Sequence, residues 1–112
     1  MNYLRTQRLR TALSQEEVAF LLELESGANV SRHETGVRVP DLVRVLAYAA
    51  LYGAPVEKLF ADEYFQVGRD ITSRAGVLAE RVRGEASSPF RERKLSVLAE
   101  LAARDGHNPP AQ

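Results

Sequence analysis

Apolar residues recur every three or four positions along most of the chain, which is the spacing of amphipathic helices. No stretch alternates apolar and polar residues convincingly, and hairpin turn pairs such as Asn-Gly are missing. The pattern therefore predicts an all-α protein of about seven helices. Five are expected in the first sixty-odd residues, at about 4–12, 15–22, 26–35, 40–52 and 55–60, and two more after residue 63.

Residues that favour helix ends lie at the expected boundaries. Ser14 precedes the second helix, and Glu17 follows it by three positions, as in a capping box. Ser26 is a second N-cap, and Gly36 suits the left-handed residue that ends a helix. Pro40 is tolerated in the first turn of the fourth helix. These signals make the helices between residues 14 and 36 the best-defined part of the sequence.

The apolar residues within the helices predict which faces are buried. In the helix at 26–35, Val30 is expected to face the core. The short helix at 55–60 is expected to bury Val56, Leu59 and Phe60. The buried stripe of the fourth helix is expected to comprise Leu42, Val45, Leu46, Ala49 and Ala50.

After residue 62 the pattern changes to a stripe with alternating steps of four and three, as in a coiled coil. A break at 84–89 precedes a last amphipathic helix at about 90–104, so a helical hairpin is equally consistent with the pattern. We expect a DNA-binding domain at 1–62, a helical dimerisation or partner region at 63–104, and a disordered tail at 105–112. The residues expected to dimerise, or to pack within the chain, are Tyr64, Ile71, Ala75, Leu78, Val82, Leu95 and Leu98.

Composition restricts the possible chemistry. The 112 residues contain fifteen basic and fifteen acidic side chains, no cysteine and two histidines. Disulfides and thiolate metal sites are excluded, and neither a phosphate-binding glycine loop nor a metal-ligand spacing is present. We therefore expect no enzyme activity, no cofactor and no metal. The first 62 residues hold seven basic against eight acidic side chains, which by itself argues mildly against nucleic-acid binding.

The hydropathy of the chain also bears on its location. The first residues lack the apolar segment of a secretory signal, and no apolar run approaches the length of a membrane span. We expect a cytoplasmic protein without membrane contact.

Several short motifs occur in a fixed order between residues 4 and 60. Leu13-Ser14-Gln15-Glu16-Glu17-Val18-Ala19 comes first, Val30-Ser31-Arg32-His33-Glu34-Thr35-Gly36 follows, and Arg38, Pro40 and Leu59-Phe60 complete the order. In this arrangement the chain resembles the lambda-repressor-like, or Xre-type, helix-turn-helix regulators. The resemblance implies that the helix at 26–35 is a recognition helix that enters the major groove of double-stranded DNA. We expect a homodimer on an inverted repeat, because one recognition helix reads few base pairs.

Helical geometry places three candidate base-contacting residues on or beside one face of that helix. Arg32 can donate two hydrogen bonds to guanine, Asn29 can pair with an adenine edge, and Ala28 can contact a thymine methyl group. The alternative for Arg32 is an exposed, solubilising charge. Residues expected at the DNA backbone are Ser14, Gln15, Ser26, Gly27, Ser31, Thr35 and Arg38.

The resemblance implies one structural ion pair, and the sequence departs from the usual family pattern in the turn before the recognition helix and at Gly27. An inward carboxylate at Glu34 needs a partner, and the family commonly supplies an arginine from the first helix, here Arg8. The turn before the recognition helix is one residue longer than usual and carries Glu23 and Glu25. Gly27 replaces a polar residue that is common in relatives. These departures bear on the strength of DNA binding more than on the fold.

The sequence thus favours a transcriptional regulator, with repression preferred over activation. One alternative is an antitoxin or adaptor whose C-terminal helices bind a protein partner while DNA binding is secondary or lost. Another is a structural helical dimer that has kept the fold without binding DNA.

Overall fold

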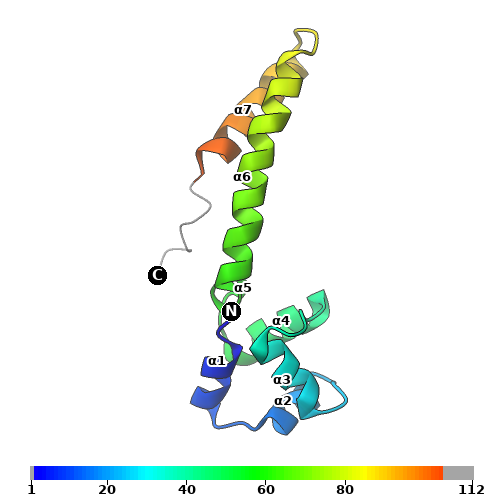
Figure 1. Cartoon of the computed structure of the whole chain (residues 1–112), viewed down its shortest axis with the longest axis vertical. Coiled ribbons are helices and arrows are strands. Elements are labelled where there is room, and N and C mark those ends of the chain that lie inside the picture. Colours follow the sequence, from blue (N-terminus) through cyan, green and yellow to red (C-terminus); the bar gives the residue numbers. More distant parts are fainter. Residues whose placement is uncertain (1, 105–112) are drawn as a thin grey trace. The chain divides into compact units, whose positions relative to one another are not determined.

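The computed structural model describes residues 2–104, which form helices joined by short connections and contain no strand (Figure 1). This confirms the predicted all-α class. The helices of the described residues are α1 Leu4–Thr11, α2 Gln15–Leu21, α3 Gly27–Thr35, α4 Leu42–Tyr52, α5 Val56–Leu59, α6 Ala61–Arg83 and α7 Pro89–Ala103.

The ends of α2 and α3 follow from their capping residues. The Ser14 hydroxyl accepts a hydrogen bond from the Glu17 amide, and the Glu17 carboxylate accepts one from the Ser14 amide, which completes the predicted capping box. These bonds to the charged form lower the pKa of the Glu17 carboxyl. The Ser26 hydroxyl accepts from the Ala28 amide, and Gly36 ends α3 with a left-handed φ of 79°.

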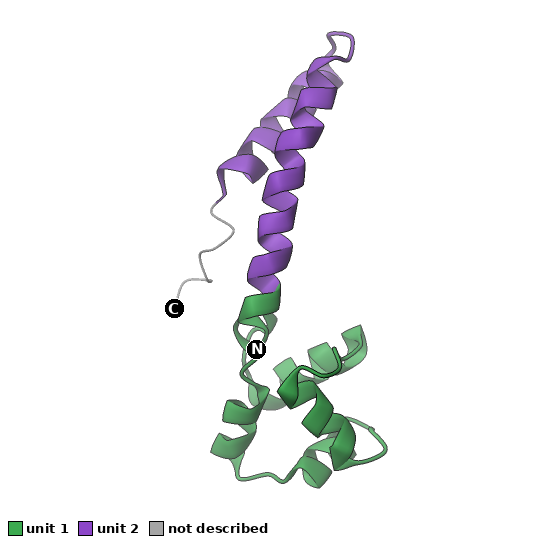
Figure 2. Cartoon of the chain, viewed as in Figure 1, with its two compact units in different colours: residues 1–63, 110–112 green, residues 64–109 purple. Residues whose placement is uncertain are grey.

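The chain divides into two compact units, coloured separately in Figure 2. Among the described residues, unit 1 extends to Glu63 and unit 2 begins at Tyr64, inside α6. The expected disordered tail at 105–112 lies outside the described residues. No helix within residues 2–104 combines the length and the apolar content needed to cross a membrane.

Unit 1 has a core to which all of its first five helices contribute, directly or at their ends. Val30 is fully buried on the inner face of α3, as the helical pattern predicts. Leu59 and Phe60 are buried at the end of α5, also as predicted. The buried cluster consists of Leu4, Val18, Ala19, Leu22, Val30, Tyr48, Leu59 and Phe60.

The prediction for α4 was correct for Val45 and Ala49, which are half-buried against the core, and wrong for the other three residues. Leu42 and Leu46 are 72% and 54% exposed, and Ala50 is exposed as well. The residue buried most deeply is Tyr48, whose ring packs edge-on against His33 of α3 at a centroid distance of 5.7 Å. Burying the large tyrosine ring removes more apolar surface from water than burying a leucine, provided the hydroxyl finds a partner, and this orients α4.

Unit 2 is an antiparallel hairpin of α6 and α7 with a small core (Figure 1). Ser88 caps α7 by accepting a hydrogen bond from the Arg91 amide, and Pro89 occupies the first turn. The buried cluster consists of Ala75, Ala79, Val82 and Leu98, with Leu95 and Leu101 packed against it.

Candidate nucleic-acid interface

The two faces of α3 have different environments. Val30 and His33 are buried against the core of unit 1, whereas Ala28, Arg32 and Thr35 are exposed. Asn29 and Ser31 lie between these faces and are half-buried. The predicted outer face of α3 is therefore available to a large ligand such as DNA.

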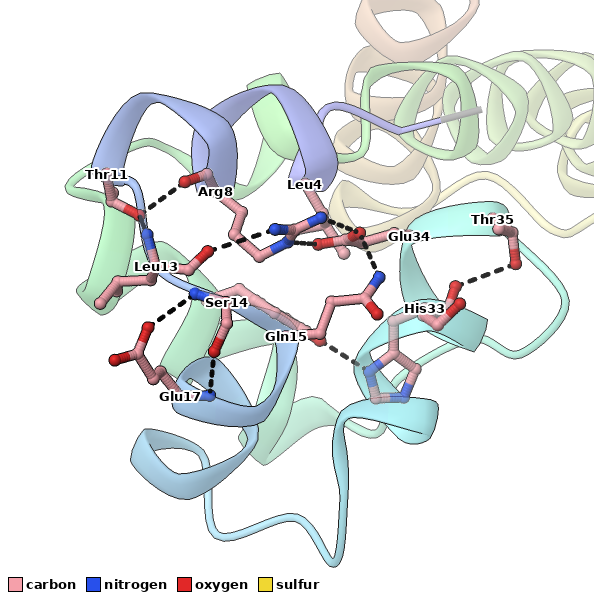
Figure 3. Close-up of polar contacts among 12 residues, drawn as sticks. Leu4, Arg8, Thr11, Leu13, Ser14, Gln15, Glu17, His33, Glu34 and Thr35 are labelled. Carbon is pink, nitrogen blue, oxygen red and sulfur yellow. Dashed lines mark hydrogen bonds and ion pairs between the residues drawn. The ribbon is translucent and has the colours of Figure 1, made fainter.

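A polar network fixes α3 to the first two helices (Figure 3). Arg8 Nε donates to Glu34 Oε2 at 2.6 Å, and Arg8 Nη2 donates to Glu34 Oε1 at 3.1 Å. Gln15 Nε2 donates to the same Oε1 at 3.1 Å, and Arg8 Nη1 donates to the Leu13 carbonyl. The structure thus brings together Arg8 and Glu34 in a bidentate pair, and the hydrogen bond to Glu34 raises the pKa of Arg8.

This pair is almost removed from solvent, since the side chains of Arg8 and Glu34 are 11% and 2% exposed. A buried ion pair contributes little net stability against an apolar replacement, but it defines one arrangement of the elements it joins. Here it sets the rotation of α3 relative to α1.

Gly27 lies inside unit 1 and not on its outer surface. Its amide donates to Glu16 Oε1 at 2.8 Å, and a Cβ at this position would lie 2.9 Å from the same oxygen and 3.0 Å from the Glu16 amide. The expectation that Gly27 contacts the DNA backbone is therefore corrected: α2 occupies that space. Glycine is required because the start of α3 approaches α2 so closely.

His33 forms a buried polar contact that the sequence did not reveal. Its Nδ1 and the Tyr48 hydroxyl share a hydrogen bond of 2.8 Å, and His33 is 4% exposed. Burial lowers the pKa of His33, although the charge of Asp41 opposes the shift. Burial also raises the pKa of Tyr48. The neutral forms of both residues are therefore favoured, and His33 acts in packing.

Two of the three candidate base-contacting residues contact each other. Arg32 Nη1 donates to Asn29 Oδ1 at 3.2 Å, across one turn of α3. Both side chains can exchange this exposed bond for bonds to base edges at small cost, because water already competes for it. Ala28 is exposed one turn before Arg32.

The candidate backbone-contacting residues lie at the start of α2, along α3 and just after α3. Ser14 and Ser26 are engaged as N-caps, and Gln15 is engaged with Glu34. The Thr35 hydroxyl donates to the Ser31 carbonyl at 3.0 Å. Arg38 is exposed just after α3, and within residues 2–104 its side chain makes no hydrogen bond or ion pair.

The turn before α3 adopts a conformation that glycine normally provides. Glu23 has a φ of +57°, in the left-handed region. Arg44 of α4 supports this turn, since its Nε donates to the Leu22 carbonyl and its Nη2 to the Glu23 carbonyl. Arg44 is thereby tied to the end of α2. Glu23 and Glu25 remain exposed and place negative charge beside the start of α3.

The residues expected to dimerise separate into two groups. Four of them, Ala75, Val82, Leu95 and Leu98, pack between α6 and α7 of the same chain. The other three, Tyr64, Ile71 and Leu78, are exposed.

A second exposed apolar surface, on unit 1, was missed, in part because Leu42 and Leu46 were assigned to the core. It comprises Val39, just before α4, and Leu42, Val43 and Leu46 at the start of α4, and we call it the α4 patch.

The fold and the exposed face of α3 define a helix-turn-helix protein. A family model described as a helix-turn-helix domain matches residues 2–60, so the chain belongs to this family. The match is consistent with the lambda-repressor-like resemblance. No curated protein and no solved structure matches the chain. Within the described residues, no group of three or more histidine, aspartate or glutamate side chains is arranged to hold a metal ion.

Proposed function

We propose that the protein is a sequence-specific transcriptional regulator that inserts α3 into the major groove of DNA. The observation that carries this proposal is the orientation of α3. The buried Arg8–Glu34 pair and the buried Val30 hold its inner face, while Ala28, Asn29 and Arg32 lie on or beside the outer face. These three residues would contact bases.

The DNA backbone would be contacted on both sides of α3. Free amides at the start of α2, next to Ser14 and Gln15, suit a phosphate oxygen. Ser26, Ser31 and Thr35 would contact the backbone alongside α3, and Arg38 would clamp a phosphate after it.

We further propose that two copies bind an inverted repeat, because one recognition helix contacts few base pairs. Two such helices read successive major grooves when they lie about 34 Å apart. The α4 patch follows the recognition helix directly and belongs to the same unit, which makes it a suitable contact between two copies. A small protein that covers its operator would act most simply by blocking the promoter, so repression is favoured.

Fluorescence anisotropy with labelled promoter fragments and a random duplex, at two salt concentrations, tests DNA binding. Specific binding that weakens with salt is expected. Arg32→Ala should relax specificity at one base pair and cost about 1–3 kcal/mol, whereas Arg38→Ala should weaken binding to all duplexes alike. Arg69→Ala, in unit 2, is the matched control and should change neither the specificity nor the overall affinity for DNA. Equal effects of Arg32→Ala and Arg38→Ala on every duplex would contradict the assigned roles.

A second function is favoured by a separate observation on unit 2. Ile71, Leu78, Phe90 and Val97 are exposed on a hairpin whose core is already formed by other residues. Large exposed apolar side chains grouped on one surface mark interaction sites. The protein would then also act as an adaptor that binds another protein through α6 and α7.

A further inference from the structure

One side of the hairpin carries two adjoining hollows of about 410 and 420 Å³. Leu78 of α6 and Leu98 of α7 line both hollows, so the two form one continuous groove along unit 2. Ile71 lines the first hollow, and Phe90 and Val97 line the second. We call this surface the hairpin groove.

The hairpin groove is apolar and open. Phe90 is 70% exposed, and Ile71, Leu78 and Val97 are each about half exposed. Helices that expose an apolar stripe ordinarily bury it against another layer, and a two-helix hairpin has none of its own on this side. The apolar lining of the groove suits the apolar face of one further helix.

The charged residues of the groove have mostly one sign. Arg74 and Arg81 line the first hollow, and Arg93 and Lys94 line the second. Lys94 Nζ is paired with Glu85, the single acidic lining residue, at 3.1 Å. Within residues 2–104, none of the three arginines makes an ion pair. The remaining acidic residues of the described hairpin line neither hollow.

From this combination we propose that the hairpin groove binds an acidic amphipathic helix of a different protein. Pairing of two copies through this surface would bring Arg74, Arg81 and Arg93 of one chain against the same residues of the other. Like charges opposed in this way disfavour association, whereas carboxylates on the partner satisfy all three arginines. The proposal rests on the adaptor function above and is independent of DNA binding by unit 1.

The spacing of the arginines specifies the partner further. Arg74 and Arg81 are seven residues apart on α6, which is about two helical turns or 10.5 Å. A partner helix that lies along α6 would present acidic residues seven positions apart, beside an apolar stripe with steps of three and four. The apolar stripe would fill the groove next to Leu78.

The test uses the full chain and two labelled synthetic helical peptides with the same leucine stripe. One peptide carries glutamates beside the stripe at seven-residue spacing, and the other carries lysines at those positions. The protein should bind the glutamate peptide at least tenfold more tightly. Arg81→Glu should weaken that binding about tenfold and strengthen binding of the lysine peptide. Arg69→Glu, the same change away from the groove, should leave both affinities unchanged.

Several outcomes would overturn the proposal. Equal binding of the two peptides, or no binding of the glutamate peptide at concentrations on the order of 1 mM, would do so. A dimer that Arg81→Glu dissociates in light scattering would identify the groove as a contact between copies. Stronger binding to anionic lipid vesicles than to the peptide would identify a membrane surface. Titration of each variant with random duplex DNA reports on unit 1 separately, so loss of one activity is distinguishable from loss of the other.

Discussion

The two units of this chain differ in how their helices are held together. Unit 1 buries eight core residues between short helices and joins α1 to α3 through a solvent-excluded ion pair. Unit 2 uses longer helices but buries four core residues, and its Arg83–Glu80 and Lys94–Glu85 pairs are exposed. The comparison indicates that a larger core and a buried ion pair fix the helices of unit 1, whereas a smaller core joins those of unit 2. Both units also expose apolar side chains, and we propose that these contact other molecules.

The two units are expected to differ most in how much unfolding free energy is lost when an ion pair is broken. Glu34→Ala leaves the buried Arg8 without its carboxylate and should cost about 3–5 kcal/mol of unfolding free energy. Glu80→Ala removes the exposed partner of Arg83 in unit 2 and should change stability little, because water screens that pair. Urea denaturation followed by circular dichroism compares the two variants. Similar losses for both would mean that the Arg8–Glu34 pair is not specially buried in solution.

The sequence predicted the helix-turn-helix well because its signals there are local. Ser14 and Glu17 cap α2 through bonds within four residues, and Ser26 and Gly36 define α3 in the same way. The orientation of α3 also followed from periodicity, since Val30 lies two residues from both Ala28 and Arg32, a rotation of about 200° that places it on the opposite face.

Other features depend on contacts that periodicity does not specify. The phase of α4 is determined by Tyr48, which is buried because His33 of another helix satisfies its hydroxyl. The position of Gly27 in the sequence predicted a contact with the DNA backbone, but its close approach is to Glu16 of α2.

The stripe on α6 contains two faces that the sequence did not separate. Ala75 and Val82 face α7, and small residues there allow close packing of the two helices. Ile71 and Leu78 line the groove beside them. Periodicity reveals that a stripe is apolar, but it does not reveal which edge the next helix covers.

The hydroxyl groups of two tyrosines in α4 are expected to contribute differently to the stability of unit 1. Tyr48→Phe removes the partner of His33 Nδ1 and should cost about 1–3 kcal/mol, because a buried polar atom is left unsatisfied. The buried Tyr52 hydroxyl has no hydrogen-bond partner among the described residues, and burial raises its pKa to about 12. Tyr52→Phe should therefore preserve or slightly increase stability in the same urea experiment. A larger loss for Tyr52→Phe than for Tyr48→Phe would contradict this assignment.

Acid should weaken unit 1 through His33. Its pKa is lowered in the folded chain by burial, so the unfolded chain binds the proton more readily. The contribution of neutral His33 to the free energy of unfolding is fully present above the ordinary histidine pKa, near 6.5. It is lost as the pH falls through the lower pKa that His33 has in the folded chain. Denaturation at about pH 7.5 and pH 5.5 measures the loss, and NMR titration of the imidazole gives its pKa directly. A His33 pKa at or above the ordinary value would overturn the prediction.

The smallest expected effect concerns the acidic turn of unit 1. Glu25 is exposed beside the start of α3, where its charge would repel the DNA backbone without contacting a base. Glu25→Gln should tighten binding to all duplexes by about threefold at low salt, and the gain should shrink as ions screen the charge. Glu100→Gln makes the same change of charge at an exposed position of unit 2. If both variants bind DNA equally more tightly, total charge and not the position of the turn controls affinity. If only Glu25→Gln does, the turn itself restrains the affinity of the recognition helix.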